Sequence, residues 1–267
     1  MSDTIKLSSP GTREFWEIPV LFEDEQLLAL NKPTGLLTSP DRSDAARPNL
    51  MKLLHHDIER GAPWAARRSG LNYLMNAHRL DREISGILLL AKTKPMLVAL
   101  ANQFGSEKPL KTYAALVRGS MHQDTFEIEA KIAPHPVKLG LMRVDEKSGK
   151  RARTEFTVRE RFKGFSLLEC RPLTSRTHQI RVHLQHLGLP ILGDSTYGGP
   201  QLMLSSLKRD FRLKPKKVER PLLSTPALHA EKLVLPHPVT GNEISIEAPA
   251  PKDMTVALKY LRLYAQA

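Results

Sequence analysis

The stretch AHRLDREISGILLLAK, residues 77–92, places one acidic residue between two arginines and directly ahead of an apolar run. The run from Ile87 to Ala91 lacks the alternation of a half-exposed strand, and it is bounded by Gly86 and by a Lys-Thr-Lys segment. This pattern predicts a strand that is buried on both faces. Asp81 therefore falls in a tight loop just ahead of a rigid element, where a scaffold can hold a carboxylate in one place.

The composition is strongly basic. Forty Lys and Arg residues stand against 28 Asp and Glu among 267 residues, a formal net charge of +12. Such an excess attracts polyanions and favours a nucleic-acid partner over an acidic metabolite. A basic surface without functional meaning is the alternative that charge alone leaves open.

Other classes of protein are disfavoured by the same sequence. The apolar run at 87–91 is far shorter than the roughly 20 residues that cross a bilayer, and the first residues, MSDTIKLSSPGTREF, contain no apolar signal region. The single cysteine, Cys170, forms no internal disulfide and supports no cysteine-built zinc site. We therefore expect a cytoplasmic protein that does not enter a membrane.

Apolar periodicity and turn residues divide the rest of the chain into short elements. They predict a hairpin at 20–33, helices at 48–58 and 94–105, a strand at 109–119, a hairpin at 152–173, a helix at 177–187, a hairpin at 228–249 and a helix from 252.

Because the strands arrive mostly in hairpins and no regular strand-helix-strand alternation is visible, the sequence predicts an α+β fold. We expect a single catalytic domain at 18–267, with a central mixed, largely antiparallel sheet flanked by helices and loops. Residues 1–17, punctuated by a Pro-Gly pair, are expected to form a flexible tail. Irregular insertions are expected near 133–150 and 200–224.

Three segments contain polar groups that a core would not select. They are HRLD at 78–81, KTY at 111–113, and SRTHQIRVHL at 175–184 with the later GDSTYGG at 193–199. Each lies at the predicted end of a strand or helix, which is how a site is assembled from distant parts of a chain.

Together these segments resemble the RluA-type family of RNA pseudouridine synthases, whose pattern reads HRLD…SG, K-x-Y and RTHQIR-x-H…G-x-PI-x-GD…YG. The opening NKP-x-G and the late LHA…L-x-x-PHP-x-TG also fit, so the resemblance covers roughly residues 20–248. Ile84 and Ser175 depart from the Thr and Gly that relatives usually have there. Both departures lie beside the expected functional residues and affect substrate fit more than chemistry.

The resemblance implies isomerisation of uridine to pseudouridine within RNA, without metal or cofactor. By position, Asp81 is the expected catalytic aspartate, Tyr113 the ring that stacks on the target base, and Arg176 the partner of the Asp81 carboxylate. Arg79 matches the position that can enter the RNA helix in place of the flipped nucleotide. The family also makes a monomer the default, and both ribosomal RNA and transfer RNA remain candidate substrates.

The chemistry of the reaction agrees with these residue types. Departure of uracil leaves a sugar with oxocarbenium character, which a carboxylate can stabilise or attack. An arginine favours the ionised carboxylate, and its planar fork can hold it in one orientation. A base must also leave the stack before it reacts, and an aromatic ring contributes ~1–3 kcal/mol to binding it.

Basic residues around these motifs are candidate RNA contacts. Besides Arg79, we expect Lys111 and Arg181 to bind RNA, although Arg181 in a purely structural role is an open alternative. The segment LKRDFRLKPKKVER, residues 207–220, predicts a phosphate grip with the contacts Lys214, Lys216 and Lys217, and its alternative is a solvated loop.

Two other functions compete with catalysis of this isomerisation. A catalytically silent RNA-binding protein that keeps the fold would explain the charge. Metal-assisted RNA hydrolysis rests only on His178, His183 and His186, which lack an HExxH spacing or a carboxylate ligand nearby. We therefore expect no metal site.

Overall fold

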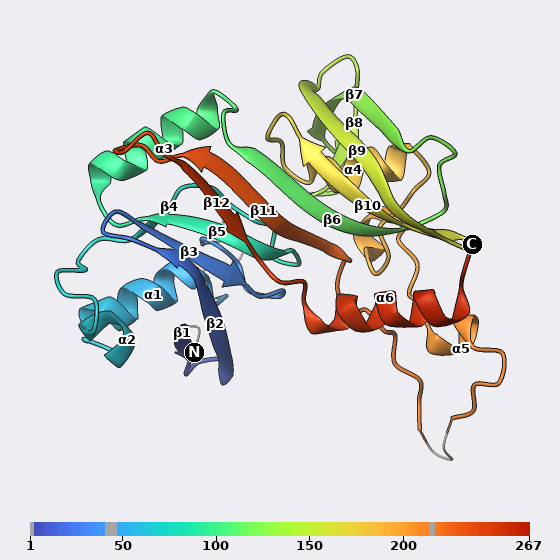
Figure 1. Cartoon of the computed structure of the whole chain (residues 1–267), viewed down its shortest axis with the longest axis horizontal. Coiled ribbons are helices and arrows are strands. Elements are labelled where there is room, and N and C mark those ends of the chain that lie inside the picture. Colours follow the sequence, from blue (N-terminus) through green and yellow to red (C-terminus); the bar gives the residue numbers. More distant parts are fainter. Residues whose placement is uncertain (1–2, 41–46, 214–216) are drawn as a thin grey trace. The chain divides into compact units, whose positions relative to one another are not determined.

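The computed structural model describes residues 3–40, 47–213 and 217–267. The chain divides into two compact units, the first formed by Met1–Leu110 and Ala230–Pro249 and the second by Lys111–His229 and Ala250–Ala267. Each unit joins segments that are distant in the sequence and combines antiparallel strands with helices (Figure 1).

The first unit contains β1 (Thr4–Ser9), β2 (Glu14–Glu23), β3 (Leu27–Lys32), α1 (Leu50–Glu59), α2 (Pro63–Ala66), β4 (Met75–Asn76), β5 (Ser85–Ala91), α3 (Lys94–Gly105), most of β11 (Leu228–Pro236) and β12 (Glu243–Glu247). The second unit contains β6 (Leu110–Arg118), β7 (Thr125–Pro134), β8 (Met142–Val144), β9 (Lys150–Phe162), β10 (Phe165–Pro172), α4 (Gln179–His186), a 3₁₀ turn (Ser195–Tyr197), α5 (Leu204–Leu207) and α6 (Lys252–Tyr264).

The central strands of the first unit, β3 and β5, pair antiparallel and are covered on both faces. Alternate residues enter two cores. One core packs against α1 and contains Leu28, Leu30, Leu88 and Leu90. The other packs against α3 and β12 and contains Leu27, Ala29, Ile87 and Leu89. Figure 1 shows the two helices on opposite sides of these strands. The predicted strand buried on both faces is confirmed, since every residue of β5 is buried.

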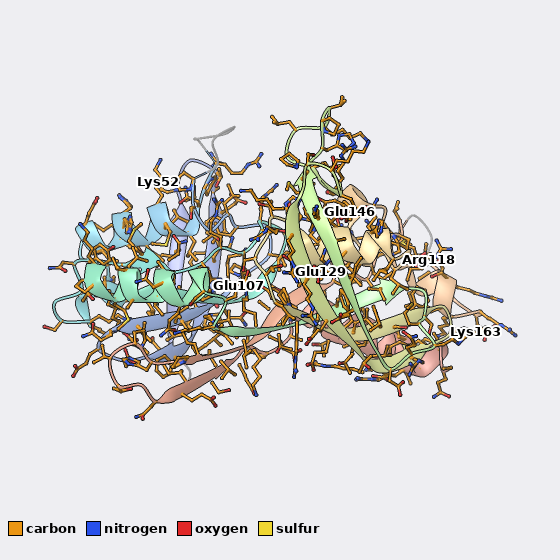
Figure 2. All side chains as sticks on the ribbon, turned by 90° about the horizontal axis from the view of Figure 1, so that it is seen from above. Lys52, Glu107, Arg118, Glu129, Glu146 and Lys163 are labelled. Carbon is orange, nitrogen blue, oxygen red and sulfur yellow. The ribbon has the colours of Figure 1, made fainter. Side chains whose placement is uncertain are left out.

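The second unit is built on a sheet in the order β6-β10-β9-β7-β8. The predicted hairpin at 152–173 is confirmed: β9 and β10 pair antiparallel through a turn at residues 162–165. Arg118 and Lys163 lie at the turn end of this sheet (Figure 2), where the Gly119 N–H donates to the Gly164 carbonyl at 2.8 Å. The candidate site residues of this unit gather near the other end of β9, at Lys150.

The N-terminal residues depart from the sequence prediction. The flexible tail expected at 1–17 is wrong for residues 4–9, which form β1, and for residues 14–17, which belong to β2 and pair with β1 in a hairpin. Ile5 and Leu7 are 0% and 1% exposed and pack in the α1 core. Two apolar residues at alternate positions suffice here, because β2 supplies the partner strand and α1 covers the face.

The remaining predicted elements are confirmed to within two residues at each end, except that the first strand of the hairpin predicted at 20–33 begins six residues earlier, at Glu14. In the expected insertion near 133–150, β8 pairs with the end of β7 and extends the sheet. The expected insertion near 200–224 contains α5, while Lys214 and Lys216 lie outside the described residues. The boundaries of a single catalytic domain at 18–267 stay a prediction.

Candidate active site

Asp81 lies in the loop between β4 and β5, and we call residues 78–84 the Asp81 loop. Its side chain is half-buried, and its own carbonyl accepts a hydrogen bond from the Ile84 N–H at 3.1 Å, which closes a turn directly ahead of β5. The loop therefore passes directly into the most deeply buried strand of the unit.

The residues on either side of Asp81 are held by a second loop, residues 32–38, which carries the NKP-x-G motif. The Thr38 hydroxyl donates to the Leu80 carbonyl at 3.0 Å and lies 3.3 Å from the Leu80 N–H, from which it accepts. On the other side, the Gly35 N–H donates to the Arg82 carbonyl at 2.8 Å, and the Arg82 Nε returns a bond to the Gly35 carbonyl at 3.0 Å. The backbone that carries the Asp81 carboxylate is thus clamped before and after it.

Lys32 is fully buried at the base of this clamp. Its Nζ donates to the carbonyls of Pro33 and Leu36, both at 2.8 Å, and to that of Arg82 at 3.3 Å. Burial lowers the pKa of Lys32 to about 7, although the negative charges of Asp81 and Glu83 oppose that shift. The three acceptors match the three N–H groups of the protonated amine, so Lys32 ties both loops together.

His78 anchors the start of the Asp81 loop to β5. Its Nε2 accepts a hydrogen bond from the Leu89 N–H at 3.1 Å, and its ring stacks on Phe104 with centroids 5.0 Å apart. The ring therefore acts as a structural acceptor and fixes the entry of the loop.

Gly86 at the exit of the loop admits no side chain. Its φ is +118°, and a Cβ there would lie 2.2 Å from the Ala230 carbonyl oxygen of β11. The glycine of the Ser-Gly pair is required by this close approach of two strands.

In the second unit, Lys111 and Tyr113 lie at the start of β6. Tyr113 is half-buried and pairs with Cys170 of β10. The Lys111 Nζ donates to the Ser175 hydroxyl at 2.6 Å. Ser175 is thus more than a neutral departure from the expected glycine, because its side chain ties β6 to the segment that carries Arg176.

Arg176 is held from several directions. Its Nε donates to the Arg151 carbonyl at 3.0 Å, its Nη1 to the Ser175 carbonyl at 2.9 Å, and its backbone N–H to the Gln179 Oε1 at 3.1 Å. The side chain is half-buried. These bonds restrict the guanidinium to one position near the start of β9.

Gln179 organises the backbone around Arg176 from inside the unit. Its Oε1 also accepts from the Thr174 hydroxyl at 2.8 Å, while its Nε2 donates to the Arg153 carbonyl at 2.9 Å and to the Thr154 hydroxyl at 3.0 Å. The Gln179 side chain is 4% exposed and makes four hydrogen bonds, so it links the start of α4 to β9.

Arg181 was predicted to bind RNA, and this prediction is wrong. Its Nε and Nη2 donate to the two carboxylate oxygens of Asp194 at 2.7 and 2.8 Å, and the two side chains are only 2% and 1% exposed. The guanidinium also lies 4.9 Å from the centroid of the Tyr197 ring. Within the unit, Asp194 balances the charge of Arg181 and the Tyr197 ring lies against its guanidinium. The alternative that Arg181 has a structural role is therefore the one that the structure supports.

Two of the three histidines considered for a metal site, His178 and His183, have side-chain partners within the second unit. His178 adopts the left-handed conformation, and its Nδ1 lies 2.6 Å from the Tyr197 hydroxyl. His183 is buried with its Nδ1 2.9 Å from the Thr154 hydroxyl, and burial lowers its pKa to about 4, which keeps the ring neutral. Among the described residues, no group of three or more His, Cys, Asp or Glu side chains converges as metal ligands.

The predicted residues thus fall into two groups. Asp81 and the exposed Arg79 belong to the first unit, whereas Lys111, Tyr113 and Arg176 gather at one end of the sheet of the second. Lys217 is exposed in the loop after α5. The pairing of Asp81 with Arg176 stays a prediction. Five further residues lie in or beside the sequence motifs but carry no predicted role: Lys32, Thr38, Gln179, Asp194 and Tyr197.

Comparison with known proteins defines the class. The sequence profile of the RNA pseudouridylate synthase family matches residues 26–186, well over half of the chain. The chain therefore belongs to this family of RNA-modifying isomerases, and the predicted enzyme class is confirmed.

Several relatives of the chain are named ribosomal large subunit pseudouridine synthase D. The chain is 35% identical over 252 residues to the ribosomal large subunit pseudouridine synthase D of Xylella fastidiosa, covering 92% of this chain and 70% of that protein. It is 33% identical over 265 residues to the protein of the same name in Zymomonas mobilis subsp. mobilis, covering 97% and 78%. These relatives confirm the resemblance to RluA-type enzymes.

A solved structure supports the fold. Human RNA pseudouridylate synthase domain containing 4 matches with a TM-score of 0.68 at 23% identity, covering 91% of this chain and 92% of that one. The α+β pseudouridine synthase fold predicted from the sequence is confirmed. Among the described helices, none combines the length and apolar character needed to span a bilayer.

Proposed function

We propose that the protein converts a uridine in RNA to pseudouridine and that Asp81 is the catalytic aspartate. In this reaction the bond from uracil N1 to the ribose C1′ breaks and a bond from C5 to C1′ forms. N1 gains a proton and C5 loses one, so no oxidant, reductant or other reactant is consumed.

The observation that carries the proposal is the double clamp on the Asp81 loop. Thr38 holds the residue before Asp81, and Gly35 and Lys32 hold the residue after it. A carboxylate that only capped a turn would not need a buried lysine and a neighbouring loop to fix its backbone. A catalytic carboxylate does, because its distance to the sugar must vary by little.

The residues at the start of β6 and β9 supply the remaining roles in the proposal. Tyr113 stacks on the extruded base, and Arg176 orients and charge-pairs the Asp81 carboxylate. Lys111 and Arg79 bind phosphates or the RNA helix, with Lys217 as a further contact. The protein acts as a cytoplasmic monomer.

The proposed substrate class is ribosomal or transfer RNA. The named relatives are ribosomal large subunit pseudouridine synthases, which favours ribosomal RNA. Mapping pseudouridines in total RNA from cells with and without the gene identifies the target. Loss restricted to transfer RNA would overturn the ribosomal preference.

The test of catalysis uses purified protein and a transcript that carries tritium at uridine C5, because bond formation at that carbon releases the label to water. The wild type releases tritium, whereas Asp81→Asn abolishes the release. Glu83→Gln is the matched control, since it removes a half-buried carboxylate two residues further along the loop, and it retains most of the activity. Release by Asp81→Asn at the wild-type rate would refute the assignment. A wild-type protein that binds the RNA but releases no label would favour the silent RNA-binding protein.

A further inference from the structure

A cavity of about 310 Å³ lies in the first unit beside the Asp81 loop. Its walls come from the β1–β2 hairpin, the 32–38 loop, the segment ahead of α1 and the residue that follows Asp81. The residues that matter here are Glu14, Trp16, Gly35, Arg47 and Arg82. Small-molecule sites start at roughly 300 Å³, so the volume suits a single nucleotide unit.

The lining offers partners for both the bases and the phosphates of single-stranded RNA. The half-buried indole of Trp16 offers an aromatic surface, and a base of any identity can stack on it. Arg47 and Arg82 bring two guanidinium groups to the same cavity, and a planar guanidinium suits a phosphate. An apolar metabolite would not need the arginines, and inorganic phosphate would not need the indole.

Arg82 links this cavity to the candidate catalytic residue. It is the residue next to Asp81, and its Nε bond to the Gly35 carbonyl at 3.0 Å uses one of the five guanidinium donors and sets the direction of the side chain. Glu14, the acidic residue of the wall, accepts a hydrogen bond from the Thr12 hydroxyl at 2.6 Å, and its carboxylate suits the amino edge of a base rather than a phosphate.

We propose that this cavity binds one nucleotide of the RNA strand adjoining the target uridine, with its base on Trp16 and its phosphate between Arg47 and Arg82. The inference rests on the proposed function and adds a place for the flanking strand. It also gives a role to the N-terminal hairpin, because β1 holds Trp16 in place through the pairing of Leu7 with Trp16.

The experiment measures binding, in an Asp81→Asn background so that the probe is not converted. The probe is a fluorescein-labelled single-stranded heptanucleotide of adenylates around a central uridine, followed by anisotropy at several salt concentrations. Trp16→Leu is expected to weaken binding roughly 5- to 150-fold, the range of one lost base stack. Arg47→Gln is expected to lower the slope of log K against log salt by about 0.7, the value for one phosphate contact on a single strand.

Two matched controls leave binding unchanged. Phe15→Leu removes an aromatic ring from the same strand, but Phe15 points to the opposite side of β2 and is 58% exposed. Arg67→Gln removes one positive charge from the same unit outside the cavity. Wild-type affinity for Trp16→Leu, or a wild-type salt slope for Arg47→Gln, would overturn the proposal, as would equal losses in the controls. If Trp16→Leu loses its circular dichroism spectrum, the salt slope of Arg47→Gln decides. The anisotropy experiment measures only RNA binding, so its outcome does not depend on whether the protein releases tritium in the catalytic assay.

Discussion

The buried ion pair between Arg181 and Asp194 gives the sharpest quantitative prediction. The change Asp194→Asn removes the negative partner and leaves the Arg181 cation almost fully enclosed. Removing one partner of a buried pair typically costs ~3–5 kcal/mol, because the remaining charge has neither water nor a counter-ion. Asparagine keeps one oxygen that can accept from the guanidinium, and the Tyr197 ring still faces it at 4.9 Å, so we expect a loss at the lower end of this range, near ~3 kcal/mol.

The matched control is the ion pair of Arg262 with Glu160 in the same unit. It has the same fork-like geometry, with Nη2 donating to Oε2 at 2.8 Å and Nε donating to Oε1 at 3.1 Å, but the side chains are 55% and 33% exposed. Surface pairs contribute ~0–1 kcal/mol, so Glu160→Gln should change stability little.

The assay is urea unfolding followed by far-ultraviolet circular dichroism, with thermal unfolding as a second probe. Asp194→Asn should lower the melting temperature by roughly 6–12 °C and Glu160→Gln by about 4 °C or less. The double variant Arg181→Met with Asp194→Leu should recover much of the loss, because no charge remains buried. Equal effects of Asp194→Asn and Glu160→Gln would refute the reasoning. A lower salt slope of RNA binding in a stable Arg181→Gln protein would restore the rejected RNA contact.

Four further predictions concern other residues. The pKa of Lys32 is about 7 when folded and 10.5 when unfolded, so the unfolded chain holds more protons between these values. The free energy of unfolding of the wild type should therefore fall by up to roughly 5 kcal/mol as the pH drops from about 10.5 to 7. In Lys32→Met, urea unfolding across this range should show no such dependence on pH. The same pH dependence in both proteins would contradict the lowered pKa of Lys32. Arg176→Ala should fold normally but release tritium orders of magnitude more slowly, and near-normal release would remove its role. Gly86→Ala should destabilise the protein by at least ~1–3 kcal/mol in the same unfolding assay, whereas a neutral effect would show that β11 can withdraw. Neutralising Lys214, Lys216 and Lys217 together should lower the salt slope by about 2 if each contacts a phosphate, and an unchanged slope indicates a solvated loop.

The elements that sequence reasoning found share a local signal. The buried run at 87–91 and the hairpin turn at 162–164 are encoded in consecutive residues. Helix α1 begins at Leu50, directly after the N-cap residue Asn49, whose side chain accepts a hydrogen bond from the Lys52 N–H. The β1 strand lacked such a signal. Its six residues contain only two buried apolar positions, and it is stable because β2 and α1 cover it, which no local pattern shows.

Arg181 shows why a site residue can be misread. A basic residue inside a functional motif suits RNA binding by type, and its distinction from a structural arginine depends on Asp194, thirteen residues later across a loop. The GD…YG part of the pattern contains both Asp194 and Tyr197, which contact Arg181. Pairing the unassigned acidic residue of one motif with the arginine of another would have identified the buried pair.

Lys32 shows a limit of a different kind. A lysine is the residue type least expected in a core, and its three partners are backbone carbonyls, which every residue supplies. No partner side chain could therefore be inferred from residue types, and only the folded path of the 32–38 loop brings those carbonyls around one ammonium. The carboxylate proposed as catalytic can be predicted from a motif, because its chemistry demands a particular side chain. The lysine that holds the loop in place cannot be predicted in this way, because it donates its hydrogen bonds to backbone carbonyls. Substitutions that loosen the Asp81 loop without touching Asp81 should accordingly lie among residues whose side chains reach main-chain atoms, with Lys32 and Thr38 first.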